Sequence, residues 1–182
     1  MVRLFIGLRP PSGPRAQLGR LMTGLPGVRW QRDDQLHLTL RFIGEVENSL
    51  ADDITSALET VAAPPLALHL DGVGLFGTLK RPRLLWAGIA PSDRLRALHD
   101  KVSHALHPLG LTADERKFAP HITLARFKNS APARLERYVQ AHAALTGPPF
   151  AIEEFILFSS FLSHTGAIYK PEARFTLREK GA

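Results

Sequence analysis

The sequence predicts an α+β fold made of two similar halves, and three observations support this. The phrase "HLTLRF" (His37–Phe42) returns as "HITLARF" (His121–Phe127), at an offset of 84 residues. A proline pair at 64–65 returns at 148–149 with the same offset, and "LFIGLRP" resembles "LWAGIAP" at an offset of 81. Strand and helix patterns alternate in both halves. A repeat this long indicates a duplicated half-domain rather than a solenoid.

The expected architecture is bilobal and duplicated, within a single domain. We expect two antiparallel sheets, each backed by helices, that face each other across a central cleft. As sequence repeats, the two pseudo-symmetric lobes cover about 1–83 and 84–182.

The first half opens with "VRLFIGL" (2–8), an apolar, β-branched and aromatic run typical of a strand. A helix is expected over 12–24, where large apolar residues recur at helical spacing and a glycine ends the pattern. The segment 36–44 alternates as a strand does. An amphipathic helix over 48–63 ends at two prolines, and a strand over 66–76 follows.

The second half repeats this order. A strand over 84–89 leads into a helix over 92–107, whose apolar stripe is ended by a glycine. "HITLARF" reads as a strand, and a helix is expected over 133–143. Further strands are expected over 150–161 and 167–177.

Composition excludes several classes of protein. At 45% hydrophobic and 22% charged residues, the chain of 182 residues is typical of a globular protein. It has no cysteine, which rules out disulfides, thiolate nucleophiles and cysteine-based zinc sites. No apolar run approaches the roughly 18 residues that a membrane span needs. The N-terminal segment reads as a first strand rather than a signal peptide. We expect a cytoplasmic protein without membrane contact, and we expect a monomer.

The net charge of +6 and the pI of about 10.2 favour a polyanionic partner such as nucleic acid. One tight cluster, Lys80, Arg81 and Arg83, lies in the predicted loop "GTLKRPR" and is a candidate RNA-binding surface. A solvated basic surface would explain the same charge without any partner.

The repeated His-x-Thr pairs are the candidate site. Side chains on a strand alternate between faces, so His37 and Thr39 share one face, as do His121 and Thr123. A single such pair is usually an ordinary hydrogen-bonded histidine. Two pairs at matching positions of a duplicated fold would meet across the cleft, which favours a function.

Two facing histidines suit phosphodiester cleavage without a metal or cofactor. With an ordinary pKa of about 6.5, one can act as a neutral base while the other, protonated, donates to a leaving oxygen. The threonine hydroxyls can donate to the phosphate oxygens, and Arg126 can supply positive charge. Period-two alternation alone puts Arg126 on the face opposite His121, unless the strand twists or ends after Leu124.

Other chemistries have no support in the sequence. Neither motif has a third histidine or carboxylate at metal-ligand spacing, so no metal site is predicted. There is no GxSxG nucleophile motif, GxxxxGK[ST] loop or GxGxxG fingerprint. "GVGLFG" (72–77) has the wrong spacing for a phosphate loop and is better explained as turn glycines between strands.

Paired HxTx motifs in a chain of this length resemble the two-histidine (2H) phosphoesterases. The stretches "RLFIGL", "HLTLRFIGEV", "RPRLLWAGI" and "FAPHITLAR" resemble the bacterial and archaeal RNA 2′,3′-cyclic phosphodiesterases, also called 2′-5′ RNA ligases. The resemblance runs from about residue 2 to residue 178. It implies a bilobal cleft, hydrolysis of RNA 2′,3′-cyclic phosphate ends to 2′-phosphates, reversible 2′-5′ ligation, and no required metal or cofactor.

The resemblance also implies roles for single residues. His37 matches the proton donor to the departing 3′ oxygen, and His121 matches the base that activates water. Thr39 and Thr123 match the residues that hold the phosphate, and Arg126 matches the family's arginine after the second motif. The symmetry leaves donor and acceptor nearly interchangeable from sequence alone.

Two alternatives stay open at this point. A 2H phosphoesterase could act on a small cyclic nucleotide or an ADP-ribose cyclic phosphate instead of RNA. A non-enzymatic RNA-binding module would explain the charge but not the duplicated His-x-Thr pairs.

Overall fold

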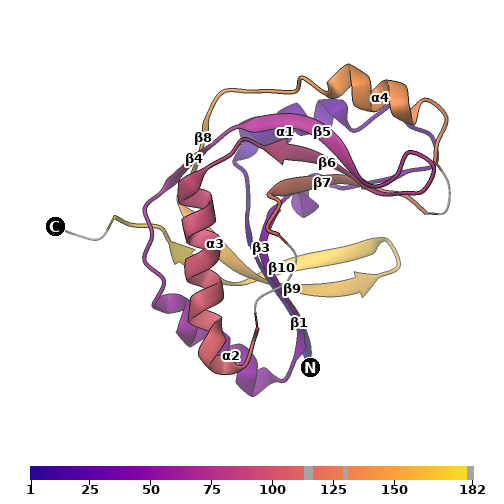
Figure 1. Cartoon of the computed structure of the whole chain (residues 1–182). Coiled ribbons are helices and arrows are strands. Elements are labelled where there is room, and N and C mark those ends of the chain that lie inside the picture. The colour runs from indigo at the N-terminus through magenta and orange to yellow at the C-terminus, as the bar shows by residue number, and fades with distance from the viewer. Residues whose placement is uncertain (113–116, 129–130, 180–182) are drawn as a thin grey trace.

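The computed structural model describes residues 1–112, 117–128 and 131–179. Within these ranges it contains one large antiparallel sheet, a two-stranded sheet and four α-helices, which confirms the α+β class (Figure 1). The strands are β1 (Val2–Leu8), β2 (Arg29–Trp30), β3 (Leu38–Val46), β4 (Leu66–Leu68), β5 (Leu70–Gly77), β6 (Pro82–Ile89), β7 (His121–Arg126), β8 (Phe150–Ile152), β9 (Glu154–Ser163) and β10 (Gly166–Thr176). The helices are α1 (Ser12–Leu21), α2 (Asn48–Glu59), α3 (Asp93–Leu106) and α4 (Leu135–His142), with 3₁₀ turns η1 (Asp33–Gln35) and η2 (His107–Leu109).

The large sheet has the strand order β10-β9-β1-β3-β7-β6-β5, with β2 paired to β7. The two predicted lobe sheets are the halves of this sheet, joined where Leu38 of β3 pairs with Ile122 of β7. Without β10, the strand order is symmetric about that junction. On one side of it lie β3, β1 and β9, and on the other side lie the corresponding strands β7, β6 and β5. The strands β5 and β9 have exchanged places: β9 pairs with β1, and β5 pairs with β6. Neither half of the sequence therefore completes its sheet alone.

Helices cover the core face of both halves. In Figure 1, α2 and α3 pack together beside the β9-β1-β3 half, and α1 and α4 lie over the β5-β6-β7 half. Helix α3 is capped at its N-terminus by Ser92, whose side chain accepts a hydrogen bond of 3.2 Å from the Leu95 amide. Its predicted apolar stripe is fully buried: Leu95, Leu98, Val102 and Leu106.

The alternation predicted for the motif strands is confirmed. Leu38 and Leu40 of β3 are buried on the helix-covered face, while His37 and Thr39 are only half-buried. In β7, Ile122 and Leu124 are buried in the same way.

Two expected strands are broken in the structure. The segments 66–76 and 150–161 each divide into a short and a long strand, at His69 and at Glu153. The short strands β4 and β8 pair with each other as a separate sheet, and only the long strands join the large sheet. Each break lets the chain pass from one sheet to the other. The two-residue strand β2 was not predicted, because its sequence is too short to show alternation.

Two glycines at equivalent positions lie where another backbone comes close. A Cβ atom on Gly88 of β6 would lie 2.2 Å from the carbonyl oxygen of Asp71, and one on Gly7 of β1 would lie 2.9 Å from that of Leu38. Such approaches cannot be relieved by moving a flexible side chain. By contrast, a Cβ on Gly19 of α1 has no atom within 4 Å among the described residues.

We expect Gly88→Ala to lower the free energy of unfolding by about 1–3 kcal/mol, as overpacking typically does. Gly7→Ala should cost less, since its contact is longer. The control Gly19→Ala should raise the free energy of unfolding by about 0.5–1 kcal/mol, because a helical glycine loses more backbone entropy than alanine. Urea unfolding measures all three variants. A Gly88→Ala protein as stable as wild type would contradict this packing.

Candidate active site

The β3–β7 junction brings the two His-x-Thr motifs together. The strands are antiparallel and Leu38 pairs with Ile122, so His37 lies toward Thr123 and Thr39 lies toward His121. The positive charge of a protonated His121 acts on His37, which also indicates that the two imidazoles are near one another. Residues 84 positions apart in the chain are thus brought next to each other.

The two imidazoles are held in the same way. The Nδ1 atom of His37 lies 2.7 Å from the carbonyl oxygen of Gln35, and that of His121 lies 2.7 Å from the carbonyl oxygen of Ala119. A carbonyl only accepts, so Nδ1 carries the hydrogen in each neutral ring. Both Nε2 atoms are then left to accept or deliver a proton in the cleft.

Aromatic rings flank both histidines. The centroid of His37 lies 4.8 Å from that of Phe5 and 5.1 Å from that of Tyr169. The centroid of His121 lies 4.8 Å from Phe76 and 6.4 Å from Trp86. These contacts leave less room for the water that a charged imidazole needs.

Burial lowers the pKa of both histidines. The pKa of His37 falls to about 4, mainly through burial, with further lowering by the charges of Arg126, His121 and Arg9. The hydrogen bond to the Gln35 carbonyl acts in the opposite direction. Burial also lowers the pKa of His121. At pH 7 the ring of His37 is therefore neutral in the ligand-free cleft, and the lowered pKa of His121 favours its neutral form as well.

A pocket of about 340 Å³ runs along β3. It brings His37, Thr39 and Arg126 together, while His121 and Thr123 are not among its lining residues. Three arginines line the pocket: Arg3, Arg29 and Arg126. Its lining residues include no aspartate or glutamate. The pocket suits an anion.

A β-bulge turns Arg126 toward the cleft. Thr123 pairs with Trp86 and Ala125 pairs with Leu85, so Leu124 is an extra residue in β7. Leu124 and Ala125 are both fully buried, and alternation resumes one residue late. The strand therefore continues past Leu124 to Arg126. Because of the bulge, Arg126 lies on the pocket side of the sheet and not on the helix side. The same bulge occurs at Leu40 in β3, where Gly7 pairs with Thr39 and Ile6 pairs with Arg41.

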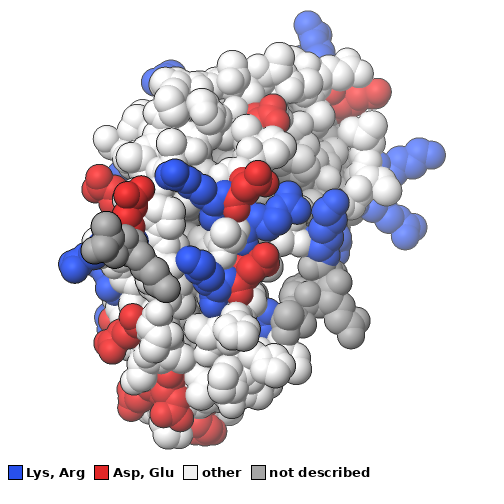
Figure 2. All heavy atoms as spheres, turned by 60° about the vertical axis from the view of Figure 1, so that its left-hand side comes forward, with Lys and Arg blue, Asp and Glu red and all other residues white. Residues whose placement is uncertain are grey.

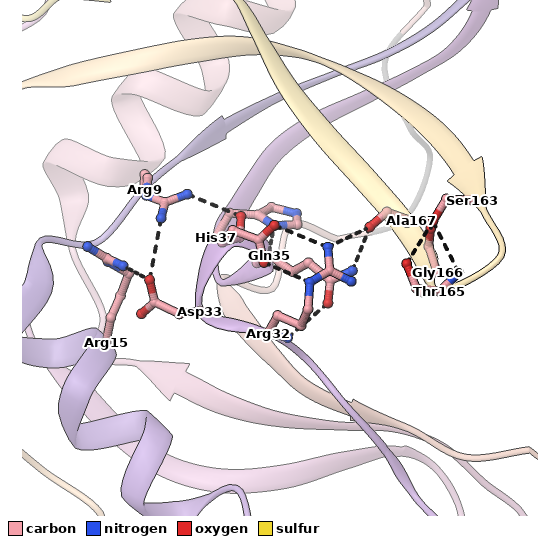
Figure 3. Close-up of polar contacts among 11 residues, drawn as sticks. Arg9, Arg15, Arg32, Asp33, Gln35, His37, Ser163, Thr165, Gly166 and Ala167 are labelled. Carbon is pink, nitrogen blue, oxygen red and sulfur yellow. Dashed lines mark hydrogen bonds and ion pairs between the residues drawn. The ribbon is translucent and has the colours of Figure 1, made fainter.

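A buried glutamine that the sequence did not single out links His37 to β10 (Figure 3). The carbonyl of Gln35 accepts the hydrogen bond from His37, and its Nε2 donates to the carbonyl of Ala167 at 2.6 Å. Its Oε1 accepts from the Arg32 amide at 2.9 Å. Gln35 therefore holds the imidazole of His37 through its backbone, while its own side chain is bonded to Ala167 of β10 and to Arg32. The stretch "RWQRDDQ" (29–35) carries no motif that could have revealed this role of its second glutamine.

The basic cluster lies apart from the pocket. Lys80 and Arg81 are exposed in the β5–β6 turn, which is closed by backbone hydrogen bonds between Thr78 and Arg81, and Arg83 is exposed on β6. None of the three lines the pocket. The β5–β6 and β9–β10 turns both lie on the right-hand side of Figure 1. The cluster could contact only parts of a ligand that extend beyond the pocket.

On the face drawn in Figure 2, lysines and arginines are interspersed with acidic residues, so this face is not uniformly positive or negative. Across the ranges that the structure covers, no three histidine or acidic side chains converge as metal ligands would. None of the helices in the same ranges is both long and apolar enough to cross a membrane.

Known proteins resemble this chain in sequence and in fold. The family model of the 2′-5′ RNA ligase superfamily matches residues 10–160. The RNA 2′,3′-cyclic phosphodiesterase of Thermotoga maritima is 33% identical over 177 residues, which cover 93% of this chain and 92% of that protein. The protein of the same name from Geobacillus stearothermophilus is 34% identical over 87% of this chain, and the chain spans about half (51%) of its length. The crystal structure of Escherichia coli LigT complexed with 3′-AMP superposes with a TM-score of 0.78 at 26% identity, over 98% of this chain and 99% of LigT.

We expect inorganic phosphate to raise the pKa of His37 from its ligand-free value of about 4. A bound anion favours the charged imidazolium, whereas burial and the neighbouring cations disfavour it. NMR titrations that follow the histidine ring protons measure the pKa of His37 with and without phosphate. The variant Thr39→Val removes one hydrogen-bond donor to the phosphate and should show a smaller rise. A pKa of His37 that phosphate leaves unchanged would show that the anion binds elsewhere.

Proposed function

The chain belongs to the 2′-5′ RNA ligase superfamily, and from this premise we propose that it hydrolyses RNA 2′,3′-cyclic phosphate ends to 2′-phosphomonoesters. The observation that carries the proposal is the placement of two imidazoles, one from each motif copy, beside a pocket with three arginines and no carboxylate. The names of the Thermotoga and Geobacillus relatives support the same activity, and the LigT complex with 3′-AMP supports a nucleotide ligand.

The reaction needs one proton removed and one supplied. Nε2 of His121 takes a proton from water as the water oxygen bonds to phosphorus. The bond from phosphorus to the 3′ oxygen breaks, and Nε2 of His37 gives its proton to that oxygen. The products are a 3′ hydroxyl and a 2′-phosphomonoester, and the two histidines have exchanged protonation states.

Thr39, Thr123 and Arg126 hold the phosphate in this proposal. Hydroxyl and guanidinium donors aimed at the non-bridging oxygens stabilise the charge that builds up as water attacks. Arg126 is well placed for this role because the bulge turns it into the pocket beside His37. No metal or cofactor takes part in any of these steps.

The acid role of His37 depends on the substrate. Its pKa of about 4 in the ligand-free cleft means that few molecules carry the proton at pH 7. The neutral rings of the ligand-free cleft suit a base but supply no acid. The phosphate anion supplies the acid if it raises the pKa of His37 more than that of His121, so binding itself produces the acid.

Ligation uses the same groups with a different nucleophile. If a ribose 5′ hydroxyl takes the place of water, His121 removes its proton and a 2′-5′ linkage forms as the 3′ oxygen leaves. Reversible 2′-5′ ligation is thus part of the proposal.

The remaining parts of the proposal concern partners. Lys80, Arg81 and Arg83 lie outside the pocket and would add salt-dependent attraction to longer RNA. We also propose a monomer in the cytoplasm. Among substrates, RNA ends are favoured over small cyclic nucleotides and ADP-ribose cyclic phosphates, because the named relatives are RNA phosphodiesterases. A binding module without catalysis would leave the paired imidazoles unexplained.

Replacing either motif histidine should abolish turnover of RNA ending in a 2′,3′-cyclic phosphate. We expect His37→Ala and His121→Ala each to lower kcat by at least about 100-fold, since an acid or base typically contributes 10²–10⁴-fold. His104→Ala, which removes an exposed imidazole on α3, should leave kcat unchanged.

The assay is run in EDTA, and melting curves of each variant show whether it is folded. The mechanism would be excluded if one folded motif variant kept near-wild-type turnover. Loss of wild-type activity in EDTA, restored by a particular divalent metal, would exclude it as well.

A further inference from the structure

Two arginines on neighbouring strands face the same side of the sheet and line the pocket. Arg29 of β2 pairs directly with Arg126 of β7, and both line the pocket. Cross-strand partners hold their Cβ atoms about 4.5–5.5 Å apart, and like charges so placed are destabilising. A bound anion would relieve this repulsion.

Nearby carboxylates do not neutralise the pair. Asp33 is engaged by Arg9, at 3.6 Å, and by Arg15, and Asp34 forms an ion pair of 3.0 Å with Arg32. Figure 3 shows the Arg9–Asp33–Arg15 group on one side of His37. Among the residues that the structure covers, neither Arg29 nor Arg126 has an acidic partner.

Beside Arg29 stands a hydrogen-bond donor without a partner. Gln31 is only 8% exposed and lines the pocket. Its backbone amide donates to the carbonyl of Leu124 at 2.8 Å, which anchors the residue next to the β7 bulge. Its side-chain Nε2 is buried and has no hydrogen-bond partner within the described ranges. An unpaired buried donor is costly unless a ligand satisfies it.

The guanidinium groups of Arg29 and Arg126 lie next to different parts of the protein. The charge of Arg126 lowers the pKa of His37, so its guanidinium lies near that imidazole. The head of Arg29 instead reaches the β9–β10 turn, where a Cβ on Gly166 would lie 2.3 Å from its Nη2 atom. The head of Arg29 therefore lies by the β9–β10 turn, and that of Arg126 lies by His37.

We propose that Arg29 and Gln31 form a second phosphate subsite, which binds the phosphodiester next to the reacting cyclic phosphate. The inference rests on the proposed function and narrows its substrate class. A ligand with two neighbouring phosphates fills both subsites, while a cyclic mononucleotide leaves the second subsite empty. The substrate is then an oligonucleotide end rather than a single cyclic nucleotide.

The direct test is calorimetry with two product-like ligands that do not react. Adenosine 2′-monophosphate carries one phosphate, and the dinucleotide ApA ending in a 2′-phosphate carries two. Arg29→Ala should weaken binding of the dinucleotide by roughly 10- to 100-fold, the value of a hydrogen bond to a charged group, and leave the mononucleotide within about twofold. Arg126→Ala should weaken both ligands.

Two further variants sharpen the result. Gln31→Met removes the amide donor at similar volume, and should show the same preference as Arg29→Ala with a smaller loss. Arg96→Ala removes an exposed arginine on α3 and controls for net charge. Equal losses on both ligands in Arg29→Ala, or no loss on either, would overturn the second subsite, as would a wild-type protein that binds the dinucleotide no better than the mononucleotide.

Kinetics separate this inference from the proposed function. The same variants are assayed on adenosine 2′,3′-cyclic phosphate and on ApA ending in a 2′,3′-cyclic phosphate. A wild-type protein that hydrolyses neither substrate would refute the proposed hydrolysis, and the binding data would still decide whether Arg29 and Gln31 hold a second phosphate.

Discussion

The pairing of β3 with β7 is the constraint on which the rest of the site depends. One backbone register, with Leu38 opposite Ile122, joins the two half-sheets and sets the two His-x-Thr motifs side by side. The exchange of β5 and β9 strengthens this junction, because each half-sheet is completed by a strand from the other half of the sequence. The two halves cannot separate without unpairing those strands. The distance between the imidazoles is therefore fixed by the fold and not by flexible loops.

Burial in the cleft lowers the pKa of both motif histidines. Aromatic rings and positive charges keep His37 neutral, and carbonyl acceptors on Gln35 and Ala119 fix both tautomers. Arginines without carboxylates make the pocket electropositive, so the ligand that it favours is also the one that allows a histidine to become charged. Binding and protonation are thus coupled. A neutral ligand of the same shape would bind without producing the acid.

The sequence predicted the α+β class, most elements and the residues of the repeated motifs, because these leave local periodic patterns. It could not predict that β5 and β9 exchange halves, since strand pairing is non-local and both partners look alike in sequence. It gave no reason to expect the bulge at Leu124, which decides the side on which Arg126 lies. Arg29, Gln31 and Gln35 stand in a polar stretch that reads as a surface loop. Their importance comes only from what the fold packs beside them.

The central claim is that the two histidines act as acid and base on one phosphate, and a modified substrate tests it most directly. In a cyclic phosphate whose 3′ bridging oxygen is replaced by sulfur, the leaving thiolate needs no proton. The account predicts that this substrate restores turnover to His37→Ala close to the wild-type rate but leaves His121→Ala inactive. Rescue of His121→Ala instead would reverse the two roles. If neither folded variant were rescued, His37 and His121 would not be an acid–base pair.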